Sequence, residues 1–429
     1  MDEKVDVIIV GAGLAGCAAA LQLAREGLEV VLVERGPYAG SKNLSGGVLY
    51  GRVLEQLIPE YWRMAPVERA ITREVVTFLG EDTAFNMDFR NPRLAESHNA
   101  YSVLRGKFDR WLADQCEEAG VMLVTGIKVE RVLVRDGKAV GILAGEDEML
   151  ADVVILADGA NSFLAEQLGL RPRFDTAHLA VGVKELIGLP RETIEERFNL
   201  SGDEGAAYGL VGYATRGVAG GGFLYTNRES ISIGVVMHLD EVIEHGIKPA
   251  EVIEDFLAHP CIEPLIRGGK LLEYGAHLVP EGGLAMLPKL SMAGLLVTGD
   301  AAGLSVNNGF VVRGMDLAIA SGMLAAQTVL QAREKNDFGE EAMRHYNQRM
   351  EESFVLKDMR TYAGAPAFMK NPRLYHQYPQ FLSRLMSGIY QHDGQPKAHL
   401  YTLALHSLKE SGLSVLDVAR DGWKGVRSL

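Results

Sequence analysis

The sequence predicts an α/β fold with a ligand site on a parallel sheet and a second, mostly antiparallel sheet beside it. Two strand–turn–helix patterns indicate the parallel sheet, one at the N-terminus and one that begins at residue 294. Strand-like runs separated by glycines indicate the second sheet between residues 175 and 285. Glycine supplies 48 of the 429 residues, and this share favours tight turns and close backbone approaches.

Composition places the chain among globular proteins and argues against several classes. Hydrophobic residues make up 47% and charged residues 23%, and no segment is of low complexity. The net charge of −13 argues against a nucleic-acid partner and against purely electrostatic binding to an anionic membrane. No apolar window of 18 residues is free of charged side chains, so we expect no membrane span.

The N-terminus and the cysteines bear on the cell compartment. The chain opens with MDEKVDVIIVGAG, and an acidic opening that enters a strand at once predicts no signal peptide. Cys17, Cys116 and Cys261 lie far apart and form no Cys-x-x-Cys motif. We therefore expect neither a disulfide framework nor a metal or iron–sulfur site, and a reducing cytoplasm fits best.

The most informative stretch is residues 5–36, VDVIIVGAGLAGCAAALQLAREGLEVVLVERG. Its first apolar run has the length of a strand that is buried on both faces. Helical spacing follows the glycines up to Glu26, and Gly27 fits the C-terminal cap of that helix. A second apolar strand covers residues 29–33 and ends on Glu34.

The three glycines of this turn have distinct mechanical roles. Gly11 permits the tight turn, Gly13 lets the backbone approach a pyrophosphate, and Gly16 lets the helix pack closely on the strand. The helix N-terminus offers free N–H groups, and Glu34 stands where a carboxylate accepts hydrogen bonds from an adenosine ribose. The pattern predicts a dinucleotide site formed by Gly11, Ala12, Gly13, Leu14, Ala15, Gly16, Glu34 and Arg35.

The late stretch GLLVTGDAAGLSVNNGF, residues 294–310, favours FAD over NAD. Both cofactors carry adenosine diphosphate, but the ribityl chain and isoalloxazine of FAD need a second holding element. We expect a strand over Leu295–Thr298, followed by Gly299 and Asp300, whose carboxylate accepts from ribityl hydroxyls. We also expect a helix that starts near Gly309 and points its N-terminus at the flavin pyrimidine ring. A plain helix-capping turn at Gly299-Asp300 is the alternative.

Further patterns organise the chain between these two loops. SVLRGKFDRWLADQCEEAG, residues 102–120, predicts an amphipathic helix opened by Arg105. Asp136-Gly137 is a hairpin turn signal, and an apolar strand over Val153–Leu156 ends in a polar turn that contains Asp158 and Gly159. No second dinucleotide fingerprint occurs, so we expect no separate nicotinamide domain.

These patterns predict how the chain divides. We expect the FAD-binding domain in three parts and a hairpin that joins the substrate domain. A helical region ends the chain. The expected ranges are 1–74, 99–174 and 286–335 for the FAD-binding domain, 75–98 for the hairpin, 175–285 for the substrate domain and 336–429 for the helical region.

The residues resemble a known family. The pattern through Gly16, Ala20, Gly27, Val30 and Glu34 is similar to the FAD-binding start of glutathione-reductase-type flavoproteins. With ADGANS and GDAAG it resembles the geranylgeranyl-reductase and hydroxylase branch. KNLSGGVLYGRVLEQLIPEY, GGGFLYTNRESISIGVV and GGKLLEYGAHLVPEGGLAMLPKL resemble electron transfer flavoprotein–quinone oxidoreductases, above all the shorter FixC-type flavoproteins. The resemblance covers nearly the whole chain and is weakest after residue 390.

The resemblance implies a fold and a set of cofactor contacts. It implies a glutathione-reductase-type FAD-binding Rossmann domain, an antiparallel β-sheet substrate domain and a C-terminal helical region. The glycine turn and Glu34 would hold adenosine diphosphate, and Asp300 would hold the ribityl chain. Further contacts implied by matching motifs are Arg105 at the linker, Val129 beside the adenine, Ser45, Gly46 and Gly47 beside the flavin, and the turn at Asp158 and Gly159. For Arg105 a surface helix charge, and for Ser45–Gly47 an ordinary turn, are the alternatives.

The resemblance also implies partners. The mitochondrial-type enzyme carries an iron–sulfur cluster in a C-terminal cysteine-rich segment, and this chain has no cysteine after Cys261. In Fix complexes a small ferredoxin-like subunit supplies that cluster. The implied activity is electron transfer from an electron transfer flavoprotein, with its alpha and beta subunits, to a quinone, within a bifurcating complex. The implied location is the cytoplasm, peripheral to the inner face of the cell membrane.

Residue roles in this chemistry follow from the helix expected near Gly309. Backbone N–H groups of Asn308 and Gly309 would stabilise the reduced flavin, and Arg313 would add positive charge, with a surface salt bridge as its alternative. We expect no catalytic acid–base residue, because protons for the quinone can come from water. YHQYPQFLSRLMSGIY, residues 375–390, has aromatic and aliphatic residues suited to an interface or to the core of C-terminal helices.

Two other functions remain open from the sequence. One is a flavin-dependent reductase or hydroxylase of prenyl or aromatic substrates that NAD(P)H reduces directly. The other is a non-catalytic, FAD-bound interaction subunit. Reduction of the flavin by NADPH alone would indicate the first, and a flavin that no quinone reoxidises would indicate the second.

Overall fold

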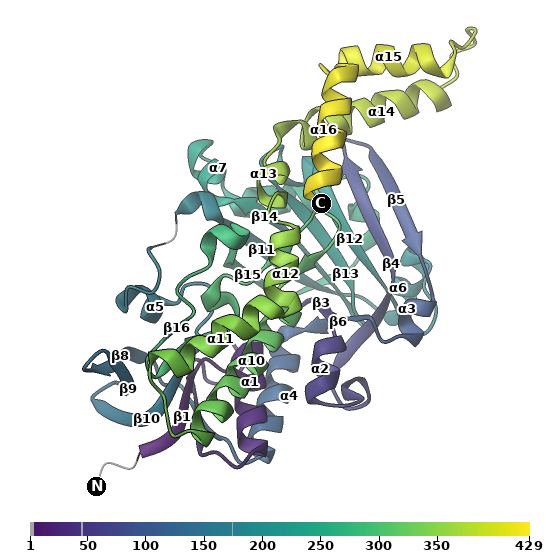
Figure 1. Ribbon diagram of the computed structural model, residues 1–429. Coiled ribbons are helices and arrows are strands. Elements are labelled where there is room, and N and C mark those ends of the chain that lie inside the picture. Colours follow the sequence, from purple (N-terminus) through teal and green to yellow (C-terminus); the bar gives the residue numbers. More distant parts are fainter. Residues whose placement is uncertain (1–3, 44–45, 174) are drawn as a thin grey trace.

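The computed structural model describes residues 4–43, 46–173 and 175–429, so the predicted contact of Ser45 lies outside the described residues. Figure 1 shows one sheet near the N-terminus with helices packed around it, a second large sheet beside it, and C-terminal helices that project from the body. The fold is α/β, as the sequence predicts.

The sheet near the N-terminus has eight strands and a parallel centre. Its order is β16-β17-β10-β1-β2-β7; in addition β9 pairs antiparallel with β10, and β8 pairs antiparallel with β9. The strands are β1 (Lys4–Val10), β2 (Val30–Glu34), β7 (Met122–Thr125), β8 (Val129–Arg135), β9 (Lys138–Ala144), β10 (Asp147–Leu156), β16 (Ser291–Met292) and β17 (Leu295–Val297).

Burial explains why the predicted strands form here. Val7, Ile8 and Ile9 of β1 have no exposed surface, because β1 lies between β2 and β10 with helices over the sheet. The helices α1 (Leu14–Arg25) and α10 (Met315–Glu334) pack on each other. A Cβ atom added to Gly322 would lie 2.2 Å from the carbonyl oxygen of Ala15, so this contact requires a glycine.

The second sheet has nine strands and is mostly antiparallel. Its order is β15-β11-β14-β13-β12-β4-β6-β3, and β5 pairs with β4. The strands are β3 (Gly46–Tyr50), β4 (Val67–Leu79), β5 (Ala84–Arg90), β6 (Ala100–Leu104), β11 (Leu179–Gly188), β12 (Glu204–Gly212), β13 (Gly220–Thr226), β14 (Ser230–His238) and β15 (Lys270–Pro280).

Two strands from distant parts of the chain meet at the middle of this sheet. β4 and β12 pair in parallel, which is the exception to the antiparallel pattern. The side chain of Arg69 in β4 is fully buried and donates hydrogen bonds to the carbonyl oxygens of Asn227 (2.7 Å), Gly202 (3.0 Å) and Glu204 (3.0 Å). Arg69 therefore connects β4 to the start of β12, through Gly202 and Glu204, and to the turn after β13, through Asn227.

The sheets divide the chain less simply than the predicted ranges do. The hairpin of β4 and β5 lies in the nine-stranded sheet. β3 and β6 lie in that sheet too, although their residues fall in the ranges that the sequence assigns to the FAD-binding domain. β3 lines the glycine-rich site described below, through Gly46, Gly47 and Val48. The exact domain boundaries stay a proposal.

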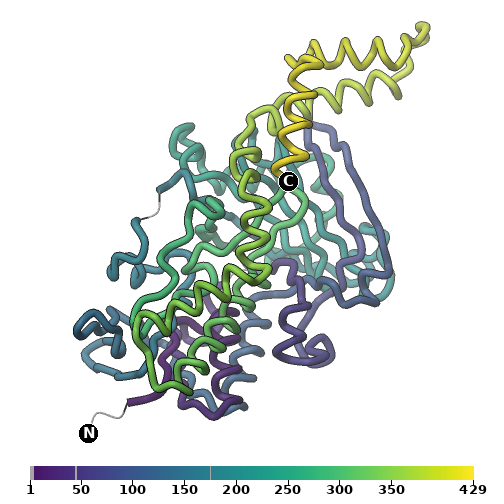
Figure 2. The backbone as a smooth tube through the Cα atoms, viewed as in Figure 1, coloured from purple at the N-terminus to yellow at the C-terminus, as the bar shows by residue number. Residues whose placement is uncertain are grey.

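Helices complete the molecule and dominate its C-terminal part. The tube in Figure 2 shows α14 and α15 side by side, extending away from both sheets. The remaining helices are α2 (Arg52–Leu57), α3 (Arg93–Glu96), α4 (Arg105–Glu118), α5 (Phe163–Gln167), α6 (Arg191–Phe198), α7 (Leu239–Glu244), α8 (Pro249–Ala258), α9 (Glu263–Ile266), α11 (Glu340–Glu352), α12 (Phe354–Thr361), α13 (Ala365–Met369), α14 (Gln377–Tyr390), α15 (Leu400–Glu410) and α16 (Val415–Ser428).

Short 3₁₀ helices occur at several turns. They are η1 (Tyr61–Arg63), η2 (Thr176–His178), η3 (Tyr213–Thr215), η4 (Gly283–Met286), η5 (Gly299–Ala302) and η6 (Pro372–Leu374). Among the described residues, no helix combines the length and the apolar composition needed to cross a membrane.

One predicted helix is wrong, and one predicted segment is less buried than a core helix. No helix starts near Gly309. Residues 306–313 instead form a hairpin of two short strands, β18 (Val306–Asn307) and β19 (Val312–Arg313), and α10 begins only at Met315. In α14, Pro379 is the one buried residue among the described side chains, so this helix is mostly half-exposed.

Candidate functional site

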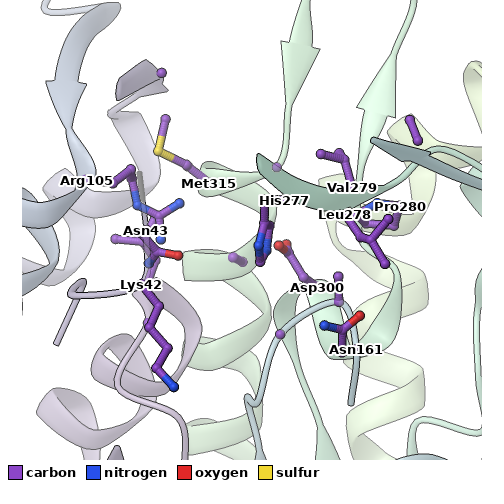
Figure 3. Close-up of a pocket in the computed structure, with 18 of the residues that line it drawn as sticks. Lys42, Asn43, Arg105, Asn161, His277, Leu278, Val279, Pro280, Asp300 and Met315 are labelled. Atoms are coloured by element: carbon purple, nitrogen blue, oxygen red, sulfur yellow. The ribbon is translucent and has the colours of Figure 1, made fainter. Parts of the chain in front are cut away.

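A cavity of about 740 Å³ lies between the two sheets. The carboxyl ends of β1, β2 and β10 border one part of it, and β11, β13 and β15 border another. Figure 3 shows Lys42, Asn43 and Arg105 on one side, Leu278 to Pro280 on the other, and His277 and Asp300 between them. A cavity at the carboxyl ends of parallel strands is where open α/β sheets bind ligands.

The first glycine turn has two glycines required by protein packing and one that is not. Gly11 has a φ of +106°, and an added Cβ would lie 2.3 Å from the carbonyl oxygen of Ala157. At Gly16 an added Cβ would lie 1.9 Å from the carbonyl oxygen of Gly11. At Gly13 an added Cβ would meet no atom within 4 Å, and Gly13 lines the cavity. The absence of a side chain at Gly13 leaves ligand space.

Glu34 closes the turn from the end of β2. Its carboxylate accepts hydrogen bonds from the backbone N–H groups of Ala12 (3.1 Å) and Gly36 (2.6 Å). These bonds fix the carboxylate at the wall of the cavity, where Arg35 also lies. Glu34 thus holds the glycine turn in place and keeps acceptor capacity for a ligand hydroxyl.

Asp300 lines the cavity between the sheets, and its side chain is exposed to that cavity. It follows β17 within η5, so the end of a parallel strand positions it. Burial raises the pKa of its carboxyl group, while the positive charges of Arg105 and Lys184 act in the opposite direction. This carboxylate therefore faces the cavity close to two cations.

Arg105 begins α4 and is held by the same helix. Its guanidinium donates to both carboxylate oxygens of the buried Asp109, at 2.7 and 2.9 Å. The amide of Asn43 donates to Asp109 at 2.5 Å. Burial lowers the pKa of Arg105, but the stronger combined effect of Asp109 raises it. Arg105 is therefore a fixed cation that lines the cavity, and its contact with a cofactor stays a prediction.

The residues fit FAD when tested against this geometry. Gly13 and Gly159 both line the cavity, and a Cβ at either position would meet no protein atom and would fill ligand space. Five basic residues line the same cavity and suit a diphosphate: Arg35, Lys42, Arg105, Lys128 and Lys184. Burial raises the pKa of Asp158, in the turn after β10, to about 6, against opposing effects of Ser162 and Arg171.

Most predicted contact residues meet at this cavity. Those that line it are Gly11, Ala12, Gly13, Leu14, Ala15, Glu34, Arg35, Gly46, Gly47, Arg105, Val129, Asp158, Gly159, Asp300 and Gly309. Gly16, Gly299 and Asn308 do not line it. Gly299 is buried, has a φ of +60°, and donates its N–H to the hydroxyl of Ser321 at 2.9 Å, so it shapes the turn before Asp300.

The predicted roles of Asn308 and Gly309 need correction. The N–H of Asn308 donates to the carbonyl oxygen of Val311 at 3.2 Å, and the N–H of Gly309 donates to Oδ1 of Asn307 at 3.0 Å. Both donors are therefore used within the hairpin of β18 and β19. α10 starts later in the chain, and its N-terminus borders the cavity at Gly314 and Met315.

Arg313 is also not where the prediction placed it. It belongs to β19, and its guanidinium pairs with Asp316 at 2.6 Å and with Asp358 at 2.6 Å. Arg313 does not line the cavity, whereas its neighbours Val312 and Gly314 do. Two carboxylates balance its charge, so it joins the start of α10 to α12.

Sequence reasoning missed several polar residues of the cavity. Lys184 in β11 lies 5.7 Å from the ring centroid of Phe223, and burial lowers its pKa to about 8. A charged residue inside the apolar run AVGVKELIGL was the available signal. Lys42, Asn43 and His277 gave no signal, because tertiary contacts alone bring them to the cavity.

A second group of missed residues forms a polar end of the cavity. His238 is 6% exposed, its Nδ1 has no hydrogen-bond partner among the described residues, and burial lowers its pKa to about 4. Tyr375 donates its hydroxyl to the carbonyl oxygen of Met369 at 2.5 Å. Glu281 follows β15, and burial raises its pKa to about 7. All three line the cavity.

Comparison with protein families gives three matches along the chain. Residues 6–100 match the family described as FAD dependent oxidoreductase. Residues 179–279 match the ubiquinone-binding unit described as ETF-QO, ubiquinone-binding. Residues 365–429 match the ETF-QO/FixC family C-terminal domain.

Curated relatives match over the full length. The chain is 48% identical to the probable electron transfer flavoprotein-quinone oxidoreductase YdiS of Escherichia coli strain K12, covering 100% of both chains. It is 48% identical to the protein FixC of Salmonella typhi, again with 100% of both covered. It is 39% identical to the FixC of Azorhizobium caulinodans, with 96% of each chain covered.

Solved structures share the fold. A geranylgeranyl bacteriochlorophyll reductase-like protein from Thermoplasma acidophilum superposes with a TM-score of 0.72 at 21% identity, covering 99% of both chains. The myxobacterial chondrochloren halogenase CndH, described as FAD-dependent, gives a TM-score of 0.63 at 17% identity, covering 99% of this chain and 91% of that one. At such identities the likeness concerns the fold.

Proposed function

We propose a function that proceeds from one fact: the chain belongs to the FixC and electron transfer flavoprotein–quinone oxidoreductase family. It is a FAD-dependent oxidoreductase of that family. The proposed reaction passes electrons from an electron transfer flavoprotein, made of alpha and beta subunits, to a quinone. The proposed setting is a bifurcating Fix-type complex at the inner face of the cell membrane, with a small ferredoxin-like iron–sulfur subunit.

The observation that carries this proposal is that one cavity extends from the residues suited to FAD to the strands that match the ubiquinone-binding family. Its first part has the glycine turn, Glu34, Asp300 and the cations. Its second part is bordered by Gly220, Gly221 and Gly222 of β13, which lie within the range that matches the ubiquinone-binding family. These glycines present backbone on that wall, and protein packing requires a glycine at Gly220, where an added Cβ would lie 2.0 Å from the carbonyl oxygen of Val236.

This chain's residues prepare the site for the cofactor. Bound FAD supplies reversible one- and two-electron transfer. We propose that Gly13 and the cations bind its diphosphate, that Glu34 accepts from the adenosine ribose, and that Asp300 accepts from the ribityl hydroxyls. Arg105 holds its position through Asp109, so its charge is fixed before the cofactor binds. Gly46 and Gly47 border the site on β3, and an added Cβ at Gly47 would lie 3.2 Å from Cε of Met315, which also lines the cavity.

Rapid mixing of the purified holoprotein tests the function. We expect the flavin to be bleached by reduced electron transfer flavoprotein, to stay oxidised with NADPH alone, and to be reoxidised by a soluble short-chain quinone. Bleaching by NADPH alone would point to the flavin-dependent reductase or hydroxylase. A reduced flavin that no quinone reoxidises would point to the non-catalytic interaction subunit.

Isolation from native cells tests the proposed complex. We expect the alpha and beta subunits of an electron transfer flavoprotein and a small iron–sulfur protein to copurify with the chain. The small iron–sulfur protein would supply the iron–sulfur cluster, because this chain has no cysteine after Cys261 to bind one in its C-terminal region. A lone homomer with substrate-dependent NADPH oxidation contradicts the proposal.

A further inference from the structure

We propose that Glu281 delivers a proton from a small side pocket to the quinone in the main cavity. This inference rests on the proposed function, because it concerns the proton that quinone reduction consumes. Glu281 lies directly after Pro280, the end of β15 labelled in Figure 3, and outside the range that matches the ubiquinone-binding family.

The geometry places Glu281 in the wall between two cavities. Glu281, Asn307 and Pro366 line both the main cavity and a second pocket of about 20 Å³. That volume accommodates one water molecule. Ser305 and Tyr362 add polar groups to the lining of the side pocket. A carboxyl group in this wall can exchange a proton with water on one side and with a substrate on the other.

The backbone around Glu281 is held firmly, so its side chain has a defined position. The N–H of Glu281 donates to the carbonyl oxygen of His178 at 2.9 Å. The hydroxyl of Ser305 donates to the carbonyl oxygen of Pro280 at 2.8 Å. The amide of Asn307 donates to the Glu281 carboxylate at 3.4 Å, which is a weak bond that leaves the carboxyl group able to bind a proton.

The charge state of Glu281 suits a donor near neutral pH. Burial raises its pKa to about 7, and the hydrogen bond from Asn307 acts weakly in the other direction. A general acid works best when its pKa lies near the working pH. The titratable side chains around this end of the cavity are His178, His238, Tyr362 and Tyr375, together with Lys370, which is paired with Asp240 at 2.8 Å.

The proton balance of the reaction is simple. Reduction of a quinone to a quinol adds two electrons and two protons, and each carbonyl oxygen gains one hydrogen. The electrons are delivered through the holoenzyme. Glu281 gives one proton to one quinone oxygen and becomes a carboxylate, which a proton from solvent, relayed by the water in the side pocket, reprotonates. The second proton comes from solvent through the open side of the cavity.

The test compares two electron acceptors in the holoenzyme. A soluble short-chain quinone takes electrons with protons, whereas ferricenium takes one electron and no proton. We expect Glu281→Gln to slow quinone reduction by about 100-fold and to leave ferricenium reduction unchanged. In the wild type, quinone reduction should slow as the pH rises through about 7, because the donor loses its proton, and this dependence should vanish in the variant.

Glu74 offers a matched control. Burial also raises its pKa to about 7, but it lies in β4 and lines neither cavity. We expect Glu74→Gln to keep the wild-type rate and pH profile with the quinone. Equal slowing of quinone reduction by both variants overturns the proposal, and so does a Glu281→Gln variant that matches the wild type.

Thermal unfolding supplies a readout that does not depend on activity. Because the pKa of Glu281 is higher in the folded than in the unfolded protein, its burial lowers wild-type stability as the pH rises from about 4.5 to about 7, and this loss is constant above 7. Glu281→Gln should match the wild-type Tm near pH 4 and exceed it near pH 8. A Tm difference that does not change with pH overturns the proposal.

Failure of the proposed function can be told apart from failure of this inference. A wild-type protein that reduces ferricenium but no quinone overturns both, before any variant is compared. A wild-type protein that reduces quinone while Glu281→Gln slows both acceptors equally overturns only the role of Glu281 in proton delivery, because the change then acts on electron transfer or folding.

Discussion

Gly11, Gly13 and Gly16 show at the scale of single residues how a motif divides between folding and binding. Added Cβ atoms at Gly11 and Gly16 would collide with backbone oxygens at 2.3 and 1.9 Å, whereas one at Gly13 would enter the cavity. The sequence predicts the motif because strand, turn and helix are local. It does not predict Lys184 or Glu281, whose roles depend on strands that only the tertiary fold brings to the cavity.

Gly13→Val should separate cofactor binding from folding. An added Cβ at Gly13 meets no protein atom within 4 Å, so we expect apoprotein of near wild-type Tm. Because it occupies space proposed for the diphosphate, we expect FAD bound per protein to fall at least about tenfold, measured by flavin absorbance after gel filtration. Gly422→Val is the control, since Gly422 lies in α16 with no atom near its added Cβ. Full FAD occupancy in Gly13→Val would contradict the proposed placement.

At the scale of elements, the segment before α10 departs most from the sequence prediction. SVNNGFVVRG reads as a polar turn before a helix, and the sequence gives no reason to delay the helix to Met315. The side chains of Asn307 and Asn308 accept N–H groups of their own loop, as asparagines in turns often do, and so stabilise a hairpin. Arg313 then meets Asp358 of α12, a partner distant in sequence.

Arg313→Met should act on stability and not on the flavin. It leaves the carboxylates of Asp316 and Asp358, 5% and 32% exposed, without their cation. We expect the free energy of unfolding to fall by roughly 2–3 kcal/mol, measured by urea denaturation, and the double variant with Asp316→Asn to recover part of it.

Arg344→Met is the matched control for this prediction. Its ion pair with Glu341 is exposed, so we expect a change within about 0.5 kcal/mol. A lowered flavin reduction potential with unchanged stability in Arg313→Met would instead support the sequence hypothesis that this cation acts on the flavin.

At the scale of the whole molecule, the two sheets and the helical C-terminal region follow the predicted fold class. The nine-stranded sheet also contains β6, which pairs with β4, and β3, which pairs with β6. The sequence does not predict this, because strand patterns do not encode such long-range pairings. The projecting helices differ from a core region. Several of their apolar side chains are more than half exposed: Tyr390, Leu400, Tyr401, Val415, Leu416, Trp423 and Val426.

The exposed apolar residues of α16 should contribute to the proposed membrane contact. Val415, Leu416, Trp423 and Val426 recur at spacings that put them on one face of the helix. Because the net charge is −13, we expect binding to neutral phosphatidylcholine vesicles that is insensitive to salt, measured by cosedimentation. Leu416→Glu with Val426→Glu should weaken it at least about tenfold.

The control for this prediction is Val134→Glu, which changes an exposed apolar residue of β8 in the eight-stranded sheet. We expect vesicle binding of this variant to equal that of the wild type. If the paired change in α16 leaves vesicle binding intact, α16 is not the membrane contact.

The parallel pairing of β4 with β12 has a consequence for synthesis of the chain. β4 emerges from the ribosome early. Its neighbour β12 is translated only with residues 202–227, and so are the carbonyl groups that accept hydrogen bonds from Arg69. Until then the Arg69 guanidinium has to stay hydrated and the edge of β4 unpaired. Nascent chains that stall within this interval should therefore be the ones that chaperones hold and proteases degrade.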